Sequence, residues 1–414
     1  MIVGYWVGWR DIVEKGAEEI VKEAWDAGAN QISVFVVAGG KVFFNPMEKY
    51  GDFKPIKGCQ QDILEETIKA AKNYGIKVTA TLVCVVDPEH AKRFPGERQV
   101  DFNGKVHGYT ICPNSRLLRE YLTILARDIA SRYEVEEIEL DYIRFKRSRD
   151  ETLLPIHLFT GRHCYCSRCR KLAGEEGVDL GELEEALNLI RRLSKPTREN
   201  LEEFKRILSL GGVASLYSRY PALVEWLNFR YKSIARLVAS IKEAVAETGV
   251  KLSADLFYPT LSWQVGQNYT LLGEYLDTVK PMIYTARMGA WETSYLRKLL
   301  DKLGWEYEQF FLDYVLMLLG IPKPKSVKEF EYKGVSPDIA KRETILAKEM
   351  LPSKVKVYTG LYSVHDPDRV YNPPQVLEQT IEAALQAKPE GLYFFTLTPT
   401  PAENRKTIRS KLIN

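Results

Sequence analysis

The sequence lacks any run of 18 consecutive apolar residues, so no membrane span is expected. It also has little net charge, because 58 lysines and arginines stand against 55 aspartates and glutamates and leave +3. A chain so near balance does not suggest a protein that binds nucleic acid or another polyanion. No basic leader or cleavage site precedes the apolar residues 2–8, so a soluble cytoplasmic protein is the expectation.

Cysteine is scarce, with six in 414 residues. In an intracellular protein so few cysteines favour metal ligation or free thiols over a disulfide framework. No low-complexity segment or internal sequence repeat interrupts the chain. Apolar residues are abundant, at 45%, which is enough for a full core. The many lysines, glutamates and arginines favour a heat-adapted, thermophilic source.

Eight short apolar runs alternate with segments of helical spacing. The predicted strands are residues 2–8, 31–37, 77–86, 137–145, 251–257, 278–284, 354–362 and 391–397. The predicted helices are residues 11–27, 60–74, 115–133, 221–247, 337–350 and 374–387. This α/β alternation predicts a (β/α)8 TIM barrel. A doubly wound open sheet is the alternative, but no Gly-rich phosphate turn follows the first strand, and eight units suit closure better.

A single barrel domain is expected over residues 1–414, with two interruptions of the rhythm. Residues 146–220, which hold a cysteine cluster and a charged, helix-prone stretch at 180–210, are predicted to be an insertion after the fourth strand. Residues 303–335 are predicted to form a smaller, irregular insertion. A long loop is expected at residues 87–113.

The fourth predicted strand alternates apolar and acidic side chains. Glu137, Glu139 and Asp141 share one face at the two-residue spacing of a pleat. Carboxylates are costly to bury, but side chains near the C-terminal end of a barrel strand open into the mouth where active sites lie. Asp141 is therefore the first catalytic candidate, and a structural ion pair with Arg144 or Arg147 is the alternative.

Asp255 falls at the same place near the end of the fifth predicted strand. Consecutive strands of this fold are neighbours, so Asp255 is expected beside Asp141. Two acids in one cleft push their pKa values apart, as acid/base work on a glycosidic bond requires. Two unrelated solvated acids are the alternative. Glu139, one pleat deeper, is expected to tune or orient Asp141 as part of the catalytic group, or to be a satisfied interior acid.

Aromatic side chains gather at or just past the predicted strand ends. Sugars present apolar C–H faces, so carbohydrate clefts commonly use aromatic platforms with polar groups around them. Tyr284 is expected to donate a hydrogen bond to a sugar or a catalytic carboxylate, or else to fill a barrel layer. The substrate-binding candidates are Trp6, Trp9, Arg144, Tyr258, Tyr284 and Tyr362. Together they predict a carbohydrate partner.

Three thiols fall within six residues, at Cys164, Cys166 and Cys169. Close thiols on a loop suit tetrahedral Zn²⁺, with a fourth ligand from elsewhere in the chain. Cys112 is the predicted fourth ligand because it ends a loop on the same side of the barrel, and His163 is the runner-up. Four protein ligands would close the site and make the zinc structural. Reduced cysteines without metal, and metal-dependent hydrolysis at the cluster, are the alternatives.

Four motifs in order resemble those of the glycosyl-hydrolase-like barrel families. They are Leu140-Asp-Tyr-Ile-Arg-Phe145, Ser253-Ala-Asp-Leu-Phe257, Val265-Gly-Gln267 and Lys280-Pro-Met-Ile-Tyr284. Those families carry similar "LDYIRFP", "SADVFG", "GQ" and "PMVYP" motifs at corresponding strand ends. The Cys-Pro-Asn-Ser stretch at 112–115 and the later cysteines are similar to the zinc-binding pattern of the family 42 β-galactosidases. The resemblance implies a glycoside hydrolase.

Two departures narrow this resemblance. Lys146 stands where the families usually have Pro, and the seventh predicted strand has no Glu, which argues against the large β-galactosidase/cellulase clan. The closer analogy is to an α-amylase-type arrangement. It implies Asp141 as nucleophile or charge stabiliser, Asp255 as general acid/base and Asp366 as a third acid. The expected function is cleavage or transfer of an O-glycosidic bond, and the alternative is a non-catalytic carbohydrate-binding barrel.

Overall fold

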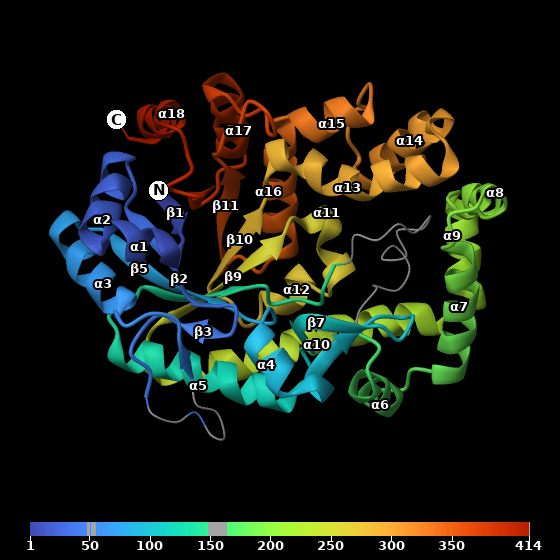
Figure 1. Cartoon of the computed structure of the whole chain (residues 1–414), viewed down its shortest axis with the longest axis horizontal. Helices are drawn as coiled ribbons and strands as arrows, with labels where there is room; N and C mark the ends of the chain where they lie inside the picture. The colour runs from blue at the N-terminus through green and yellow to red at the C-terminus, as the bar shows by residue number, and fades with distance from the viewer. Residues whose placement is uncertain (48–49, 51–54, 148–163, 414) are drawn as a thin grey trace.

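The protein is a closed barrel of eight parallel strands (Figure 1), seen in a computed structural model that describes residues 1–47, 50, 55–147 and 164–413. The barrel strands are β1 (Ile2–Val7), β2 (Gln31–Ala38), β5 (Lys77–Val83), β8 (Glu137–Asp141), β9 (Lys251–Phe257), β10 (Thr278–Met282), β11 (Lys356–Tyr362) and β12 (Gly391–Phe395). Their order is β1-β12-β11-β10-β9-β8-β5-β2, and pairing of β1 with β2 closes the ring. The predicted (β/α)8 TIM barrel is confirmed.

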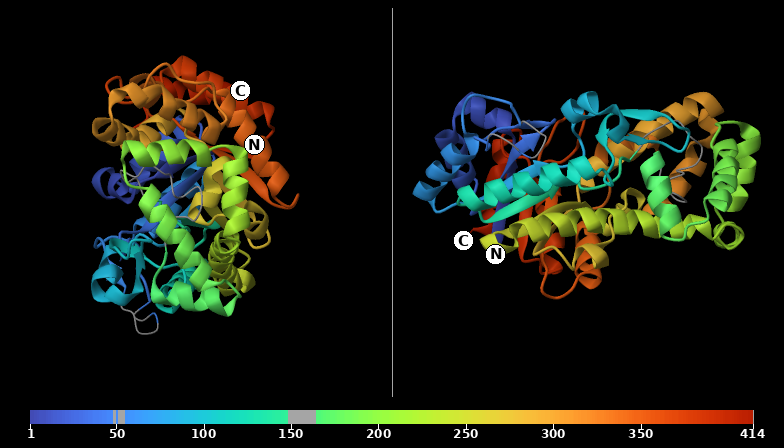
Figure 2. Two further views of the ribbon diagram at one scale, coloured as in Figure 1. Left: turned by 90° about the vertical axis from the view of Figure 1, so that its right-hand side faces the viewer. Right: turned by 90° about the horizontal axis from the view of Figure 1, so that it is seen from below.

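Helices cover the outside of the barrel, as the right-handed crossover between parallel strands requires. They are α1 (Trp9–Lys15), α2 (Ala17–Asp26), α3 (Ile63–Tyr74), α5 (Arg116–Arg132), α10 (Ala222–Val245), α11 (Pro259–Ser262), α12 (Tyr269–Leu272), α13 (Thr285–Leu303), α16 (Asp338–Met350), α17 (Pro374–Gln386) and α18 (Ala402–Leu412). The two termini lie near each other at one end of the molecule (Figures 1 and 2). Among the helices of the described residues, none is long and apolar enough to cross a lipid bilayer.

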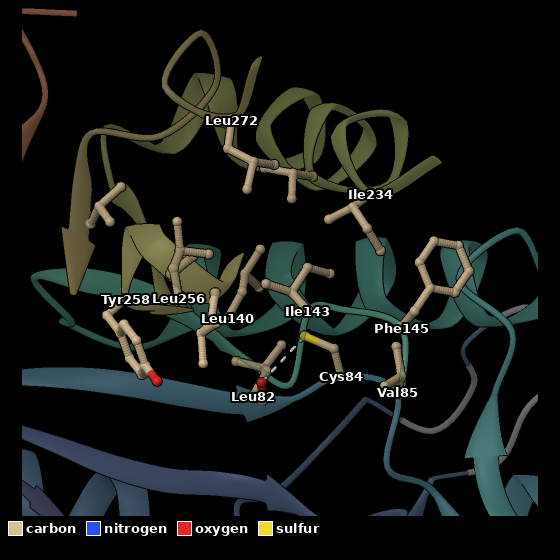
Figure 3. Close-up of a cluster of buried hydrophobic side chains, with 14 of the residues drawn as sticks. Leu82, Cys84, Val85, Leu140, Ile143, Phe145, Ile234, Leu256, Tyr258 and Leu272 are labelled. Atoms are coloured by element: carbon tan, nitrogen blue, oxygen red, sulfur yellow. Dashed lines mark hydrogen bonds between the residues drawn. The ribbon is translucent and has the colours of Figure 1, made fainter. Parts of the chain in front are cut away.

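The main core lies between the strands and the helices rather than inside the ring. Alternate residues of each strand point outwards, and Leu82, Leu140 and Leu256 from three neighbouring strands meet Ile234 of α10 there (Figure 3). Cys84 joins this cluster with its thiol 3.3 Å from the carbonyl oxygen of Leu82. The inward-facing positions are left for polar and aromatic side chains, which build the site.

Several predicted loops contain regular structure. Residues 87–113 form α4 (Pro88–Arg93) and an antiparallel hairpin of β6 (Arg98–Val100) and β7 (Val106–Ile111), so the prediction of a long loop there was wrong. The interruptions at Phe94-Pro95 and Gly104 keep each piece too short to show a clear period in the sequence. Two further short strands, β3 (Lys41–Val42) and β4 (Ile56–Lys57), extend the sheet beside β2.

The two interruptions of the barrel rhythm are largely helical. Between β8 and β9 lie α6 (Ser167–Glu175), α7 (Leu180–Leu193), α8 (Arg198–Ile207) and α9 (Leu210–Arg219), before α10. Residues 303–335 are not irregular but hold α14 (Glu308–Leu319) and α15 (Val327–Lys333). An ion pair of 2.8 Å joins Arg198 at the start of α8 to Glu306, so the two regions meet at the end of the molecule away from the termini (Figure 2). That each is an insertion stays a prediction.

Candidate active site

A cavity of about 480 Å³ opens at the C-terminal ends of the barrel strands. Five strands contribute their last residue to its wall: Val83, Asp141, Phe257, Met282 and Phe395. The other residues of the wall are Gly8, Asp11, Phe35, Tyr142, Arg144, Arg147, Tyr258, Tyr284 and Thr396. Acids, cations and aromatic rings therefore meet at the end of the barrel where this fold carries its active sites.

Asp141 ends β8 and is 7% exposed, at the wall of the cavity. Its Oδ1 accepts a hydrogen bond of 2.6 Å from the backbone N–H of Tyr142, whose φ of 52° turns the chain out of the strand. Nη1 of Arg144 lies 3.9 Å from the same oxygen. Burial raises the pKa of Asp141, while the Arg144 cation and the Tyr142 amide lower it. The ionised form of Asp141 therefore has two groups that stabilise its charge.

Asp255 lies on β9, the strand that pairs with β8. It is 2% exposed, and its Oδ1 has no hydrogen-bond partner in the described part of the chain. The pKa of Asp255 is raised well above its ordinary value, first by burial and then by the carboxylate of Asp141, whereas Trp6 and Arg144 act in the opposite direction. A carboxyl group in this environment keeps its proton to higher pH than Asp141 does. Asp255 is not one of the residues that line the cavity.

Tyr284 follows β10 and lies in the field of both acids. Its ring stacks on Phe395 with centroids 5.4 Å apart and meets the ring of Trp6 edge-on at 6.3 Å. Burial raises the pKa of Tyr284, and the charges of Asp255 and Asp141 raise it further. The phenol therefore stays protonated and is able to donate a hydrogen bond at the mouth of the barrel.

Glu139 lies one layer below Asp141 and is fully buried. Its carboxylate accepts hydrogen bonds of 2.9 Å each from Trp6 Nε1, Ser33 Oγ and Thr81 Oγ1, and it forms an ion pair with Lys280. These partners satisfy the carboxylate within the barrel. The geometry therefore favours the interior-acid alternative, in which Glu139 holds the Trp6 indole beneath the cavity.

Glu139→Gln is expected to destabilise the protein by about 3 kcal/mol, because breaking a buried ion pair leaves a poorly compensated charge. Lys280 would keep only Glu137, at 3.3 Å, and burial already lowers the pKa of Lys280 to about 8. Urea unfolding measures the difference. Thr81→Val, which removes a neutral donor to the same carboxylate, is the control and is expected to cost about 1 kcal/mol. Equal stability of Glu139→Gln and wild type contradicts the ion-pair role.

A second cavity of about 470 Å³ adjoins the first and shares Tyr142, Arg144, Arg147 and Phe257 with it. Its remaining wall residues are Val85, Val86, Tyr109, Thr110, Phe145 and Lys146. Arg144 stands between the two cavities, with its guanidinium carbon 4.0 Å from the ring centroid of Tyr142 and 4.6 Å from that of Phe257. Two aromatic rings thus lie within cation–π distance of this cation.

The predicted substrate-binding residues divide into two groups. Arg144, Tyr258 and Tyr284 line the first cavity. Trp6 lies beneath it, 1% exposed, and Trp9 stacks on Phe43 at 4.1 Å. The structure shows both tryptophans packed against other side chains. That either of them contacts a ligand stays a prediction.

Two further predicted residues lie outside the walls of both cavities. The ring of Tyr362 packs against Tyr284 at 5.9 Å. Asp366 lies in a turn after β11, where its backbone N–H donates to Val370 and its carboxylate lies 3.9 Å from Arg369. The role of Asp366 as a third acid stays a prediction.

Asp11 is the acid of the cavity wall that the sequence analysis missed. It lies in the first turn of α1, directly after β1, and an ideal Cβ placed on Gly8 would come within 2.9 Å of its Oδ2. Burial raises the pKa of Asp11. Its position just past the end of the first strand is the feature that could have identified it, since chemistry in this fold follows strand ends.

The fold brings Cys112, which follows β7, to the three cysteines at the start of α6. All four are buried, and their sulfur atoms lie within 4.8 Å of one another. Sγ of Cys112 is 3.4 Å from that of Cys169 and 3.7 Å from that of Cys166. This group could hold a metal ion. His163, the runner-up ligand, lies outside the described residues.

The sulfur geometry fits a tetrahedral ion. Zn–S bonds of about 2.3 Å place tetrahedral sulfurs roughly 3.8 Å apart, close to the observed spacings. The backbone N–H of Val100 donates to Cys164 Sγ at 3.2 Å, and Nδ2 of Asn114 donates to Cys169 Sγ at 3.3 Å. Such donors stabilise metal-bound thiolates. Four protein ligands would leave no open position, which suits a structural ion rather than a catalytic one.

A family model described as "Putative glycosyl hydrolase domain" (DUF4015) matches residues 13–298, more than half of the chain. The matched stretch contains both Asp141 and Asp255 and all four clustered cysteines. No curated protein matches the sequence.

Solved structures share the fold at low sequence identity. The β-galactosidase from the psychrophilic Marinomonas ef1 matches with a TM-score of 0.59 and 12% identity, over 99% of this chain and 59% of that one. The glycoside hydrolase domain of PgaB (BpsB) from Bordetella bronchiseptica matches with a TM-score of 0.59 and 8% identity, over 100% and 99%. The catalytic domain of β-amylase from Paenibacillus polymyxa matches with a TM-score of 0.58 and 12% identity, over 100% and 97%. These likenesses show a common fold, and the specific likeness to family 42 stays a prediction.

Proposed function

Since the chain belongs to the DUF4015 family of glycosyl hydrolase domains, we propose that it cleaves or transfers an O-glycosidic bond with the carboxyl groups of Asp141 and Asp255. The observation that carries this proposal is the contrast between the environments of the two acids. Arg144 lies beside Asp141, whereas Asp255 is buried next to a like charge. Two acids whose pKa values are held apart can act as base and acid at the same pH.

In the proposed reaction, Asp255 gives its proton to the glycosidic oxygen as the bond from that oxygen to the anomeric carbon breaks. Asp141 stabilises the positive charge that develops on the anomeric carbon, or forms a bond to it. Water, or a second sugar hydroxyl in transfer, then adds to that carbon and returns a proton to Asp255. Tyr284 donates a hydrogen bond to the sugar or to a carboxylate during these steps. The separation of the two carboxyl groups in the substrate complex decides between retention and inversion.

We further propose that the ion held by Cys112, Cys164, Cys166 and Cys169 is zinc, with a structural role. Soft thiolate donors in a tetrahedral set select zinc or iron–sulfur centres over magnesium and calcium. Cys112, which follows β7, and Cys164, Cys166 and Cys169, at the start of α6, would hold the ion, which would supply a structural link between these two parts of the chain. The reaction at the barrel mouth uses the carboxylates and takes no step at this centre.

A non-catalytic carbohydrate-binding barrel is the second candidate, and one observation favours it. Asp255 does not line the cavity and is only 2% exposed, so a glycosidic oxygen reaches it only if the residues around it move when substrate binds. Induced adjustment of this kind is common in enzymes. A binding protein would bind glycans without releasing any product.

The proposal is tested by incubating the protein with a broad panel of aryl glycosides and oligosaccharides, at moderate and at high temperature. New reducing ends or released aryl alcohol, absent from an Asp141→Asn preparation, support a glycosidase. Binding to a glycan array with no product from any bound glycan favours the carbohydrate-binding alternative instead.

The rate on any substrate found is expected to have a bell-shaped dependence on pH. Asp141 must be ionised and Asp255 protonated, and the pKa of Asp255 is the more strongly raised of the two. kcat/KM should therefore rise as pH increases through the lower pKa of the pair and fall as pH increases through the higher one. Asp255→Asn should lose the falling limb. A falling limb that survives unchanged in this variant assigns the acid to another group.

A further inference from the structure

We propose that the second cavity is a subsite for a negatively charged sugar, bound through Arg144. The inference rests on the proposed glycosidase function and names its substrate class: a glycan with an anionic residue next to the bond that is cleaved. The two cavities share a wall at Tyr142, Arg144 and Phe257, so one chain of sugars is able to occupy both. Asp141 lines the first cavity and not the second, so an anion in the second cavity is not placed against the reacting acid.

Arg144 is built as an anion receptor. It is 8% exposed, and its Nη1 is buried without a hydrogen-bond partner within the described ranges. The 3.9 Å to Asp141 is too long for a hydrogen bond. The rings of Tyr142 and Phe257 both pack against the guanidinium, with centroids 4.0 and 4.6 Å from its carbon, so they help to hold this cation in place. A fixed planar fork of this kind matches the two oxygens of a carboxylate or a sulfate ester.

Further cations line the second cavity. Lys146 and Arg147 join Arg144 in its wall, and none of the described wall residues is an aspartate or glutamate; Arg147 also lines the first cavity. The whole chain carries only +3 from 58 basic and 55 acidic residues, so three cations in the wall of one cavity are a local concentration that the total charge does not show. A cleft lined by one sign of charge attracts ligands of the other sign.

Aromatic rings in the wall of the second cavity favour a sugar over a small free anion as its ligand. Tyr109 and Tyr142 line the second cavity with 47% and 40% of their surfaces exposed. Nζ of Lys146 lies 4.7 Å from the ring centroid of Tyr109, so cation and platform are adjacent. An exposed ring beside a cation offers an apolar face to sugar C–H groups and a charge to their acidic substituent. A hexuronate or a sulfated sugar has both features.

The test compares glycans that differ only in charge. Affinities are measured by calorimetry in the Asp255→Asn background, whose substitution lies outside the second cavity and leaves bound glycans intact. The probes are oligogalacturonate, the same oligosaccharide with its carboxyl groups reduced to alcohols, and a sulfated galactan oligosaccharide, which separates carboxylate from sulfate recognition. Lys146→Gln/Arg147→Gln removes two cations of the cavity. Lys69→Gln/Arg116→Gln removes two exposed cations from α3 and α5 and is the matched control.

At least one anionic glycan is expected to bind at least about tenfold more tightly than its neutral counterpart, since charge-assisted bonds are about twice as strong as neutral ones. The preference should fall at least about fivefold in Lys146→Gln/Arg147→Gln and should not change in the control. Equal affinity for charged and neutral glycans, or equally tight binding of inorganic polyphosphate, overturns the inference. If the wild-type protein still hydrolyses neutral glycans in that case, the proposed glycosidase function is supported although the anionic subsite is rejected. Charge-selective binding without hydrolysis of any glycan contradicts the proposed glycosidase activity but supports the anionic subsite.

Discussion

Asp141→Asn is expected to lower kcat at least about a thousandfold on every glycoside that the protein hydrolyses, because it removes a group that acts on the transition state. Asparagine keeps the shape of the side chain but carries no charge, so it neither stabilises an oxocarbenium-like centre nor forms a bond to it. KM should change much less than kcat, since the anomeric carbon carries no positive charge for Asp141 to stabilise in the ground state. Steady-state kinetics on one aryl glycoside measure both.

The identity of the leaving group separates the roles of the two acids. Asp255→Asn should slow substrates with poor leaving groups by roughly 10²- to 10⁴-fold, the usual worth of a general acid. It should slow dinitrophenyl glycosides far less, because their leaving group departs without a proton. Asp141→Asn should slow both kinds alike. If the two variants respond to the leaving group in the same way, the division of roles is wrong.

Two controls show that lost activity is not lost folding. Asp11→Asn replaces another acid of the same cavity wall and should leave most of kcat. Asp255→Asn should be at least as stable as wild type at neutral pH. The raised pKa of Asp255 means that the folded state holds this proton more tightly than the unfolded state does. Its stabilising contribution is therefore present below the unfolded pKa and lost as pH rises through the folded pKa, and asparagine avoids that loss.

The barrel could be predicted because its strands appear in the sequence as eight short, largely apolar runs that alternate with segments of helical spacing. The strand ends were less predictable. The predicted strand 137–145 ends at Asp141, because Tyr142 adopts a positive φ. The pattern of apolar residues does not predict this change of backbone direction. The predicted strand 77–86 likewise ends at Val83. At the mouth of a barrel the chain leaves the sheet while its side chains remain buried, so hydrophobicity continues past the last strand residue.

The site was predictable where one strand carries the information and not where distant segments combine. Asp141 and Asp255 follow from the alternation along single strands. Arg144 contacts the rings of Tyr142 and of Phe257, 115 positions apart in the chain, and only the closed barrel brings these residues together. Glu139 shows the same limit, because its ion-pair partner Lys280 comes from a strand two places away in the barrel.

Cys112→Ser is expected to remove the bound metal and to cost more than about 4 kcal/mol of stability, because the binding energy of a structural ion is folding energy. Cys112 is the one ligand outside the segment from 164 to 169, so its loss detaches that segment from β7. Elemental analysis of the purified protein should find about one zinc per chain in wild type and little in the variant. Thermal unfolding should show the loss of stability directly.

Cys84→Ser is the matched control, because Cys84 is equally buried but lies outside the cluster, with Leu82 O available to a serine hydroxyl. It should keep the metal and lose much less stability. A strong chelator should lower the unfolding temperature of wild type and of Cys84→Ser but not that of Cys112→Ser. Tyr109 and Thr110, which line the second cavity, lie on β7 shortly before Cys112. Loss of the metal should loosen this part of the chain and so weaken glycan binding in the second cavity before the barrel unfolds. If wild type is fully stable but contains no stoichiometric metal, the four cysteines are buried thiols and the zinc proposal is wrong. The expected link between metal binding and glycan binding in the second cavity is then wrong as well.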